Sequence, residues 1–182
     1  GIRDVIRLEV GEPDFDTPEH IKDAAKKALD KGFTHYTSSA GIFPLREAIA
    51  EKTKRETGID VNPRKEVVVT DGGSCALTLA MMAVLNPGDE VLISDPCWPY
   101  GPGIKMAEGV PVRYRLSKQE GFKIDFDDLK SKITKRTRII VVNSPNNPTG
   151  YVADRKELET LADIAIEKDL LAVSYTHLTL PT

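Results

Sequence analysis

The sequence lacks most of the features that mark a specialised class of protein. It contains two cysteines, Cys75 and Cys97, which are too few for a disulfide framework or a zinc site. Its net charge of −3 provides no basic surface for nucleic acid. No apolar run approaches the length of a membrane span, and no charged-then-apolar leader opens the chain. We therefore expect a cytoplasmic protein that binds neither nucleic acid nor a membrane.

Before residue 60 the sequence predicts extended chain and two helices. An apolar stretch at residues 6–10 predicts a short strand. One helix is expected to begin with Thr17 as its N-cap and Pro18 at its first position. A second helix is expected at residues 44–57. It would bury three apolar side chains, which are Leu45, Ala48 and Ile49.

From residue 67 onward, apolar strands alternate with helices. Strands are expected at residues 67–69, 91–93, 110–116, 139–142 and 170–173. Helices are expected at residues 75–85, 100–107, after Asp125 and after Asp154, and the helix at 75–85 has so little charge that it should be buried on most sides. Continuous apolar strands that alternate with helices predict a three-layer α/β/α domain with a mostly parallel sheet.

Gly72, Gly73 and Ser74 form a tight turn between an expected strand and an expected helix. The two glycines let the backbone approach a ligand closely, and free amides at the helix start favour an anion such as phosphate. Ser74 adds a hydroxyl donor. The turn has neither the ending of a Walker loop nor the spacing of a dinucleotide-binding motif. The alternative is a tight turn that binds nothing.

Two further loops at expected strand ends carry side chains suited to a flat ring. Trp98, the one tryptophan, lies between Pro96 and Pro99, and a rigid indole there can stack on an aromatic ring. Asn147 follows the strand at 139–142 and could donate a hydrogen bond to a ring oxygen. The alternatives are that Trp98 roofs the core and that Asn147 only shapes a turn.

Tyr36, in the loop between the first two helices, could donate its hydroxyl to an anion. The alternative is that it packs against the protein or faces water.

Three other loops converge on one edge of the predicted sheet. One suits a phosphate, one a flat ring and one a polar ring substituent, so a phosphorylated aromatic cofactor fits the set better than any single motif shows.

Six motifs carry a family resemblance. They are Val10–Phe15 (VGEPDF), Thr34–Thr37 (THYT), Gly72–Ser74 (GGS), Asn86–Val91 (NPGDEV), Asp95–Pro99 (DPCWP) and Asn143–Gly150 (NSPNNPTG). In this order and spacing, over roughly residues 2–174, they resemble the class I and II aminotransferases, which are fold-type I enzymes that use pyridoxal phosphate. The resemblance implies an amino-terminal segment with a dimer-contact loop at 1–43 and part of the cofactor-binding large domain at 44–174. It leaves 175–182 as a tail that matches nothing in the family.

The resemblance also implies roles for individual residues. Gly73, Ser74 and Cys75 would hold the cofactor phosphate through backbone amides and the Ser74 hydroxyl. Trp98 would stack on the pyridine ring, and Asn147 would bind its phenolic oxygen.

Two residues of the amino-terminal segment complete the implied site. Tyr36 would reach the cofactor phosphate of the neighbouring subunit, which implies a homodimer. Gly11 would lie near the carboxylate of the substrate. The implied substrates are an amino acid and a 2-oxo acid.

The sequence departs from the family after the last expected strand. Tyr175 stands where the family has an aspartate that pairs with the pyridine nitrogen, and tyrosine is neutral near pH 7. The simplest account is that Tyr175–Thr182 is foreign to the family. The family's Schiff-base lysine is expected well beyond this point, and the fifteen lysines present lie mainly on polar helix faces or in charged loops. We therefore assign no catalytic residue and expect the isolated chain to have no transaminase activity.

Two other functions remain open from the sequence. One is a lyase, synthase or decarboxylase with the same fold and cofactor. The other is a non-catalytic ligand-binding module, such as the aminotransferase-like domain of some transcription regulators.

Overall fold

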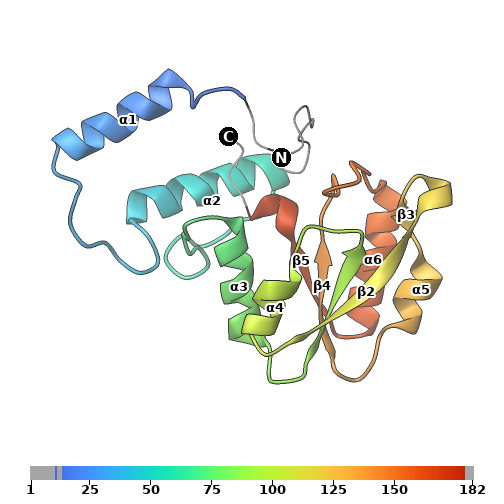
Figure 1. Cartoon of the computed structure of the whole chain (residues 1–182). Coiled ribbons are helices and arrows are strands. Elements are labelled where there is room, and N and C mark those ends of the chain that lie inside the picture. The colour runs from blue at the N-terminus through green and yellow to red at the C-terminus, as the bar shows by residue number, and fades with distance from the viewer. Residues whose placement is uncertain (1–10, 12–13, 179–182) are drawn as a thin grey trace, which may run out of the picture.

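A five-stranded sheet forms the centre of the molecule (Figure 1). The computed structural model describes residue 11 and residues 14–178. The strands are β1 (Glu90–Asp95), β2 (Val110–Ser117), β3 (Lys123–Ile124), β4 (Thr137–Val142) and β5 (Leu171–Ser174), in the order β3-β2-β1-β4-β5. Strand β1 pairs in parallel with β2 and β4, and β4 pairs in parallel with β5. The short strand β3, which the sequence did not predict, pairs antiparallel with β2.

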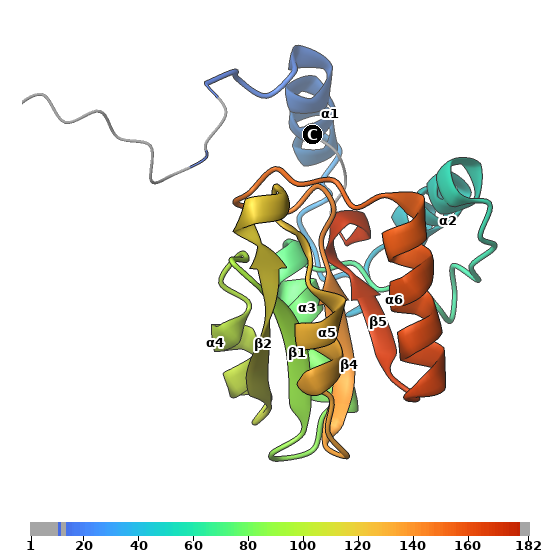
Figure 2. The same ribbon diagram turned by 90° about the vertical axis from the view of Figure 1, so that its right-hand side faces the viewer.

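Helices cover both faces of the sheet, as Figures 1 and 2 show. Helices α3 (Gly73–Val84) and α4 (Gly101–Met106) cover one face, and α5 (Phe126–Ser131) and α6 (Arg155–Glu167) cover the other. The three-layer α/β/α prediction with a mostly parallel sheet is therefore confirmed.

Alternation along the central strands explains why both faces of the sheet carry a core. Successive side chains of a strand point to opposite faces. In β1, Val91 and Ile93 pack with α3 and α4, whereas Leu92 packs with α5 and α6. All three are fully buried, and each such side chain contributes roughly 1.5–3 kcal/mol through burial.

Helices α5 and α6 begin where the sequence predicts, and side chains cap both. Asp125 precedes α5, and its carboxylate accepts a hydrogen bond from the Asp128 N–H. Asp154 and Glu157 form a reciprocal capping box at the start of α6. These local bonds fix where each helix begins.

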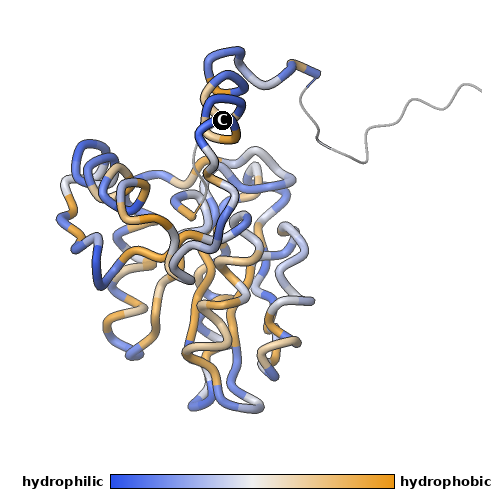
Figure 3. Tube along the Cα trace, turned by 90° about the vertical axis from the view of Figure 1, so that its left-hand side faces the viewer, coloured by the Kyte–Doolittle hydropathy of each residue, from blue (hydrophilic) through white to orange (hydrophobic). Residues whose placement is uncertain are grey.

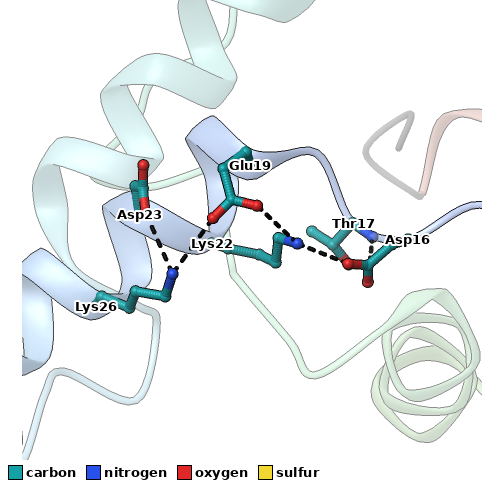
Figure 4. Close-up of polar contacts among 6 residues, drawn as sticks. All are labelled: Asp16, Thr17, Glu19, Lys22, Asp23 and Lys26. Atoms are coloured by element: carbon teal, nitrogen blue, oxygen red, sulfur yellow. Dashed lines mark hydrogen bonds and ion pairs between the residues drawn. The ribbon is translucent and has the colours of Figure 1, made fainter.

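Helices α1 (Glu19–Asp30) and α2 (Phe43–Thr57) lie apart from the sheet, and neither contains a buried residue (Figure 1). The polar side chains of α1 contact one another instead (Figure 4). Lys22 pairs with Asp16 and Glu19, and Lys26 pairs with Glu19 and Asp23. Contacts of this kind are exposed and local, so salt screens them.

Three predictions for the first 70 residues are wrong. Thr17 does not cap α1, because Pro18 occupies the N-cap position and no side chain bonds there. Helix α2 buries none of its three expected residues, since Leu45 and Ile49 are half-buried and Ala48 is exposed. The expected strand at 6–10 lies outside the described residues.

The third error concerns residues 67–69, which are not a strand. A strand requires a neighbour, and the Val69 N–H instead donates to the Ala40 carbonyl of a loop. Val68 is 65% exposed. The apolar pattern is present, but within residues 14–178 no strand pairs with it.

Helix α3 is covered on one side, not on most sides as predicted. Leu77 and Met81 enter the core, whereas Leu79 and Met82 are exposed. Figure 3 shows apolar colour outside the sheet, on the helices and loops that surround it. Along residues 14–178 no helix combines the length and apolar content that crossing a membrane requires.

Candidate functional site

The carboxyl ends of β1, β4 and β5 lie at one edge of the sheet, because these strands run in parallel. Loops follow each strand there, and cross-contacts join them. The Asn146 amide donates to Ser94 Oγ at the end of β1, at 3.3 Å. Thr176, after β5, bonds to Ser144 in the loop after β4. Ligands bind at such edges in open α/β sheets.

The turn before α3 leaves donors available for an anion. Gly72 has φ +133° and ψ 163°, a conformation that strongly favours glycine. Gly73 is buried, Ser74 is exposed, and no side chain caps the helix. The first turn contains no acidic residue. Its amides and the Ser74 hydroxyl can therefore face an anion, favoured by the dipole of a twelve-residue helix.

Cys75, half-buried in the first turn of α3, has a thiol held in its protonated form. The neighbouring Asp71 carboxylate raises the pKa of this thiol, and burial raises it further. A neutral side chain here adds no negative charge beside the helix start. The backbone amide of Cys75 is the group that the resemblance assigns to the phosphate.

Trp98 lies in the loop between β1 and α4, where its neighbours anchor the chain. Tyr100 is buried, and Cys97 packs against the same core cluster. The Tyr100 N–H donates to the Trp98 carbonyl at 2.7 Å. These anchors hold the backbone and leave the indole 42% exposed, so the ring can stack on a ligand.

The loop after β4 is organised by Asn146, which sequence reasoning missed. This side chain is buried, donates to Ser94, and accepts from the Thr149 N–H and hydroxyl. Its backbone bonds to Gly150 and Tyr151. Asn147, the predicted site residue, is exposed beside it. No local pattern distinguishes the two adjacent asparagines, because the distinction depends on Ser94, 52 positions earlier.

Asn143, at the start of the same loop, joins it to Tyr100, the residue before α4. In the amide orientation that satisfies its neighbours, its oxygen accepts from the Asn147 N–H at 3.2 Å and the Tyr100 hydroxyl at 3.3 Å. Burial raises the pKa of Tyr100 above its ordinary value, so this phenol stays neutral and acts as a donor. The backbone that carries Asn147 is thereby fixed to the core.

Residues after β5 form the short helix η2 (Tyr175–His177), which borders the same edge. The rings of Tyr175 and Tyr100 meet edge to face, with centroids 5.2 Å apart and planes at 65°. The Thr176 hydroxyl accepts from the Ser144 N–H at 3.1 Å and lies 2.9 Å from the Ser144 carbonyl. The tail is therefore packed into the edge of the site as far as Thr176.

The structure does not bring Tyr36 and Gly11 to this edge. Tyr36 is fully exposed in the loop between α1 and α2. Gly11 is exposed, and no atom lies within 4 Å of the place a Cβ would occupy. Because Tyr36 is expected to serve a neighbouring subunit, a single chain leaves its role a prediction.

No lysine lies in an apolar pocket. All fifteen fall within the described residues, and none is buried. Lys22 and Lys52 are half-buried and paired with acids, and the remainder are exposed. Nor do three His, Cys, Asp or Glu side chains in residues 14–178 gather closely enough to hold a metal ion.

Comparison with known proteins identifies the family. Residues 3–174 match the family described as aminotransferase class I and II. The chain is 46% identical to an aspartate aminotransferase of Pyrococcus abyssi, over 97% of the chain and 46% of that protein. It is 49% identical to an aspartate/prephenate aminotransferase of Thermus thermophilus, over 96% of the chain and 46% of that protein.

Solved structures agree. A crystal structure of an aromatic aminotransferase from Pyrococcus horikoshii superimposes with a TM-score of 0.90 at 46% identity, covering 96% of this chain and 47% of that one. The chain thus spans about half the length of the relatives it matches. Both the sequence match and the superposition place the chain in one family: it belongs to the class I and II aminotransferases.

Proposed function

We propose that this chain forms the cofactor-binding part of a pyridoxal-phosphate-dependent amino-acid aminotransferase, which transfers an amino group from an amino acid to a 2-oxo acid. One observation carries the proposal. The uncapped start of α3 lies toward the same end of the sheet as the carboxyl ends of β1 and β4 (Figure 1), which the half-exposed Trp98 and the exposed Asn147 follow, in a chain of this family. Relatives are named for aspartate, aromatic amino acids and prephenate.

The residues at the start of α3 fit the phosphate of the cofactor. The backbone amides of Gly73, Ser74 and Cys75 would donate to it, together with the Ser74 hydroxyl. Gly72 adopts a backbone conformation that a side chain would strain, which keeps this approach open. A dianionic phosphate is the ligand that such a helix start favours.

Trp98 and Asn147 fit the ring. The indole of Trp98 would stack on the flat face of the pyridine, because its loop is anchored on both sides by Cys97 and Tyr100. The Asn147 amide would donate to the phenolic oxygen, in a loop held by Asn143 and Asn146. When bound, pyridoxal phosphate supplies an electron sink for charge that develops on the amino acid's α-carbon.

The amino-terminal segment fits a role between subunits. Phe15, Leu29, Phe33 and Tyr36 are each more than 60% exposed, which is a large apolar area for one short segment. In a homodimer this segment would meet the second subunit, with Tyr36 reaching its cofactor phosphate. Gly11 would lie near the substrate carboxylate.

We further propose that the family's sequence ends at Ser174 in this chain and that the protein is cytoplasmic. The family match covers residues 3–174, which supports the boundary after Ser174. The proposal also keeps 1–43 as the amino-terminal segment with the dimer-contact loop and 44–174 as the partial large domain. The two free cysteines are in keeping with a reducing compartment.

Equilibrium dialysis tests the site. The chain should bind deoxypyridoxine phosphate, which keeps the ring and the phosphate but has no aldehyde to react with the surface lysines. Ser74→Ala should weaken this binding about fivefold or more, since it removes a charge-assisted hydrogen bond. Ser131→Ala, at the exposed end of α5, is the matched control and should change nothing. Because no lysine is buried, the chain alone should produce no glutamate from 2-oxoglutarate and a panel of amino acids. Equal binding by both variants would refute the phosphate site.

A further inference from the structure

Two arginines pack against one phenylalanine at the start of α2. Phe43 is the first residue of this helix, and Arg46 follows three positions later. The guanidinium carbon of Arg46 lies 5.6 Å from the centroid of the Phe43 ring. The guanidinium carbon of Arg64, an exposed residue beyond the end of α2, lies 4.0 Å from the same centroid. Two segments of the chain thus bring two positive charges to one ring.

Contact with Phe43 holds these cations without satisfying their hydrogen-bond donors. The π face of the ring attracts a cation, but the ring has no oxygen that could accept from an N–H group. A guanidinium carries its donors in a planar fork that matches the oxygens of phosphate or carboxylate. Within residues 14–178 neither Arg46 nor Arg64 donates a side-chain hydrogen bond to such an oxygen.

The other arginines of residues 14–178 differ from these two, because each forms an ion pair with a carboxylate. They are Arg55, Arg113, Arg115, Arg136, Arg138 and Arg155. The acid nearest to Arg64 in the sequence, Glu66, accepts from the Asn62 N–H instead, at 2.6 Å. Glu47 directly follows Arg46 on the helix, and adjacent helical residues do not face each other. The two stacked arginines are therefore the ones that the described carboxylates leave without a counter-charge.

Arg46 also has an unmet donor inside the protein. Its Nε is buried without a hydrogen-bond partner, and no other buried side-chain nitrogen or oxygen of the described residues is in that condition. A guanidinium stays charged, so its burial is costly unless an anion or an acceptor offsets the charge. The start of α2 adds positive potential, because its first turn contains no acidic residue and no side chain caps it.

We propose that Arg46 and Arg64 form a binding site, beside Phe43, for a small oxyanion of which inorganic phosphate is the simplest. The anion accepts hydrogen bonds from the guanidinium groups and neutralises charge that the carboxylates of residues 14–178 do not offset. The site shares no residue with the candidate cofactor site, so it is independent of the proposed function.

Nuclear magnetic resonance of the ¹⁵N-labelled chain tests the proposal with inorganic phosphate as the probe. The Arg46 Nε–H and the Phe43 backbone amide report this site, and the Gly73 and Ser74 amides report the start of α3. Phosphate should shift the Arg46 and Phe43 signals saturably. Chloride at the same ionic strength should not, because it lacks the oxygens that match the fork.

Lysine variants separate the fork from the charge. Arg46→Lys keeps the positive charge but loses the planar donors, and it should weaken phosphate binding at the Phe43 amide about fivefold or more. Arg64→Lys should do the same, and its exposed position makes it the second test if Arg46→Lys fails to fold. Arg55→Lys is the matched control, because it lies in the same helix and pairs with Glu56, and it should change nothing.

Three results would overturn the inference. One is an equal effect of chloride and phosphate, which would reduce the site to general screening of charge. The second is an equal loss of binding in Arg55→Lys and Arg46→Lys. The third is a saturable shift confined to the Gly73 and Ser74 amides, which would support the cofactor site while refuting this one.

Discussion

The sheet domain and the amino-terminal segment obtain their structure in different ways. Around β1 and β4, side chains from both faces are fully buried, and the strands pair with one another. In α1 the visible contacts join Lys22 and Lys26 to acids within one or two turns (Figure 4). The sheet domain is thus stabilised by long-range burial, whereas α1 is stabilised by contacts it makes with itself. A segment that leaves its apolar residues exposed is suited to bind another surface.

The largest difference should appear in a matched pair of leucine substitutions. Leu92→Ala, in β1, removes a fully buried side chain and should lower the free energy of unfolding by about 2–5 kcal/mol. Leu29→Ala, in α1, removes a side chain that is 63% exposed and should change it by less than about 0.5 kcal/mol. Urea denaturation followed by circular dichroism measures both. Similar losses in the free energy of unfolding for the two variants would show that α1 is packed in solution and would contradict the difference between the two regions.

A smaller difference in the free energy of unfolding is expected when a charged side chain is neutralised in each of the two regions. Glu90 is buried at the start of β1, where it accepts from Thr134, Arg136 and Thr137. Glu90→Gln should cost about 1.5–3 kcal/mol, since it weakens hydrogen bonds to a buried charge. Glu19→Gln, which removes the carboxylate that pairs with Lys22 and Lys26 on the surface, is the control and should cost at most about 1 kcal/mol.

The buried Glu90 should also make the stability of the fold depend on pH. The Thr134 hydroxyl and Arg136 hold the pKa of Glu90 below its ordinary value of 4.5. A carboxyl whose folded-state pKa is lowered stabilises the fold above the unfolded-state pKa, and that stability is lost as the pH falls through the folded-state value. Acid titration should therefore destabilise the ordinary chain below about pH 4.5 more steeply than Glu90→Gln. If the stability of both proteins falls in parallel with pH, the stabilising role of the Glu90 carboxylate is contradicted.

The sequence predicts those parts of the fold that neighbouring residues determine. The strands β1 and β4 and the start of α6 after Asp154 are predicted correctly, because neighbouring residues suffice to specify them. Residues 67–69 have the same apolar pattern and form no strand, because pairing depends on a partner far along the chain. The burial expected of α2 failed for the same reason.

The same distinction between local and long-range determinants applies to the candidate site. The places of Gly73, Ser74, Trp98 and Asn147 in the fold could be predicted, because each follows a strand or opens a helix, and their roles stay predictions. Asn146 could not, because its role depends on Ser94. The pairing of Tyr100 with Tyr175 joins residues 75 positions apart, and no spacing rule predicts it.

The central claim is that the start of α3, Trp98 and Asn147 form one site for a phosphorylated ring. Titration of the chain with deoxypyridoxine phosphate, followed by Trp98 fluorescence, tests it most directly. The account predicts saturable quenching at one ligand per chain, which inorganic phosphate reverses by competing for the start of α3. Quenching that rises linearly without saturation, or that phosphate leaves unchanged, would contradict it.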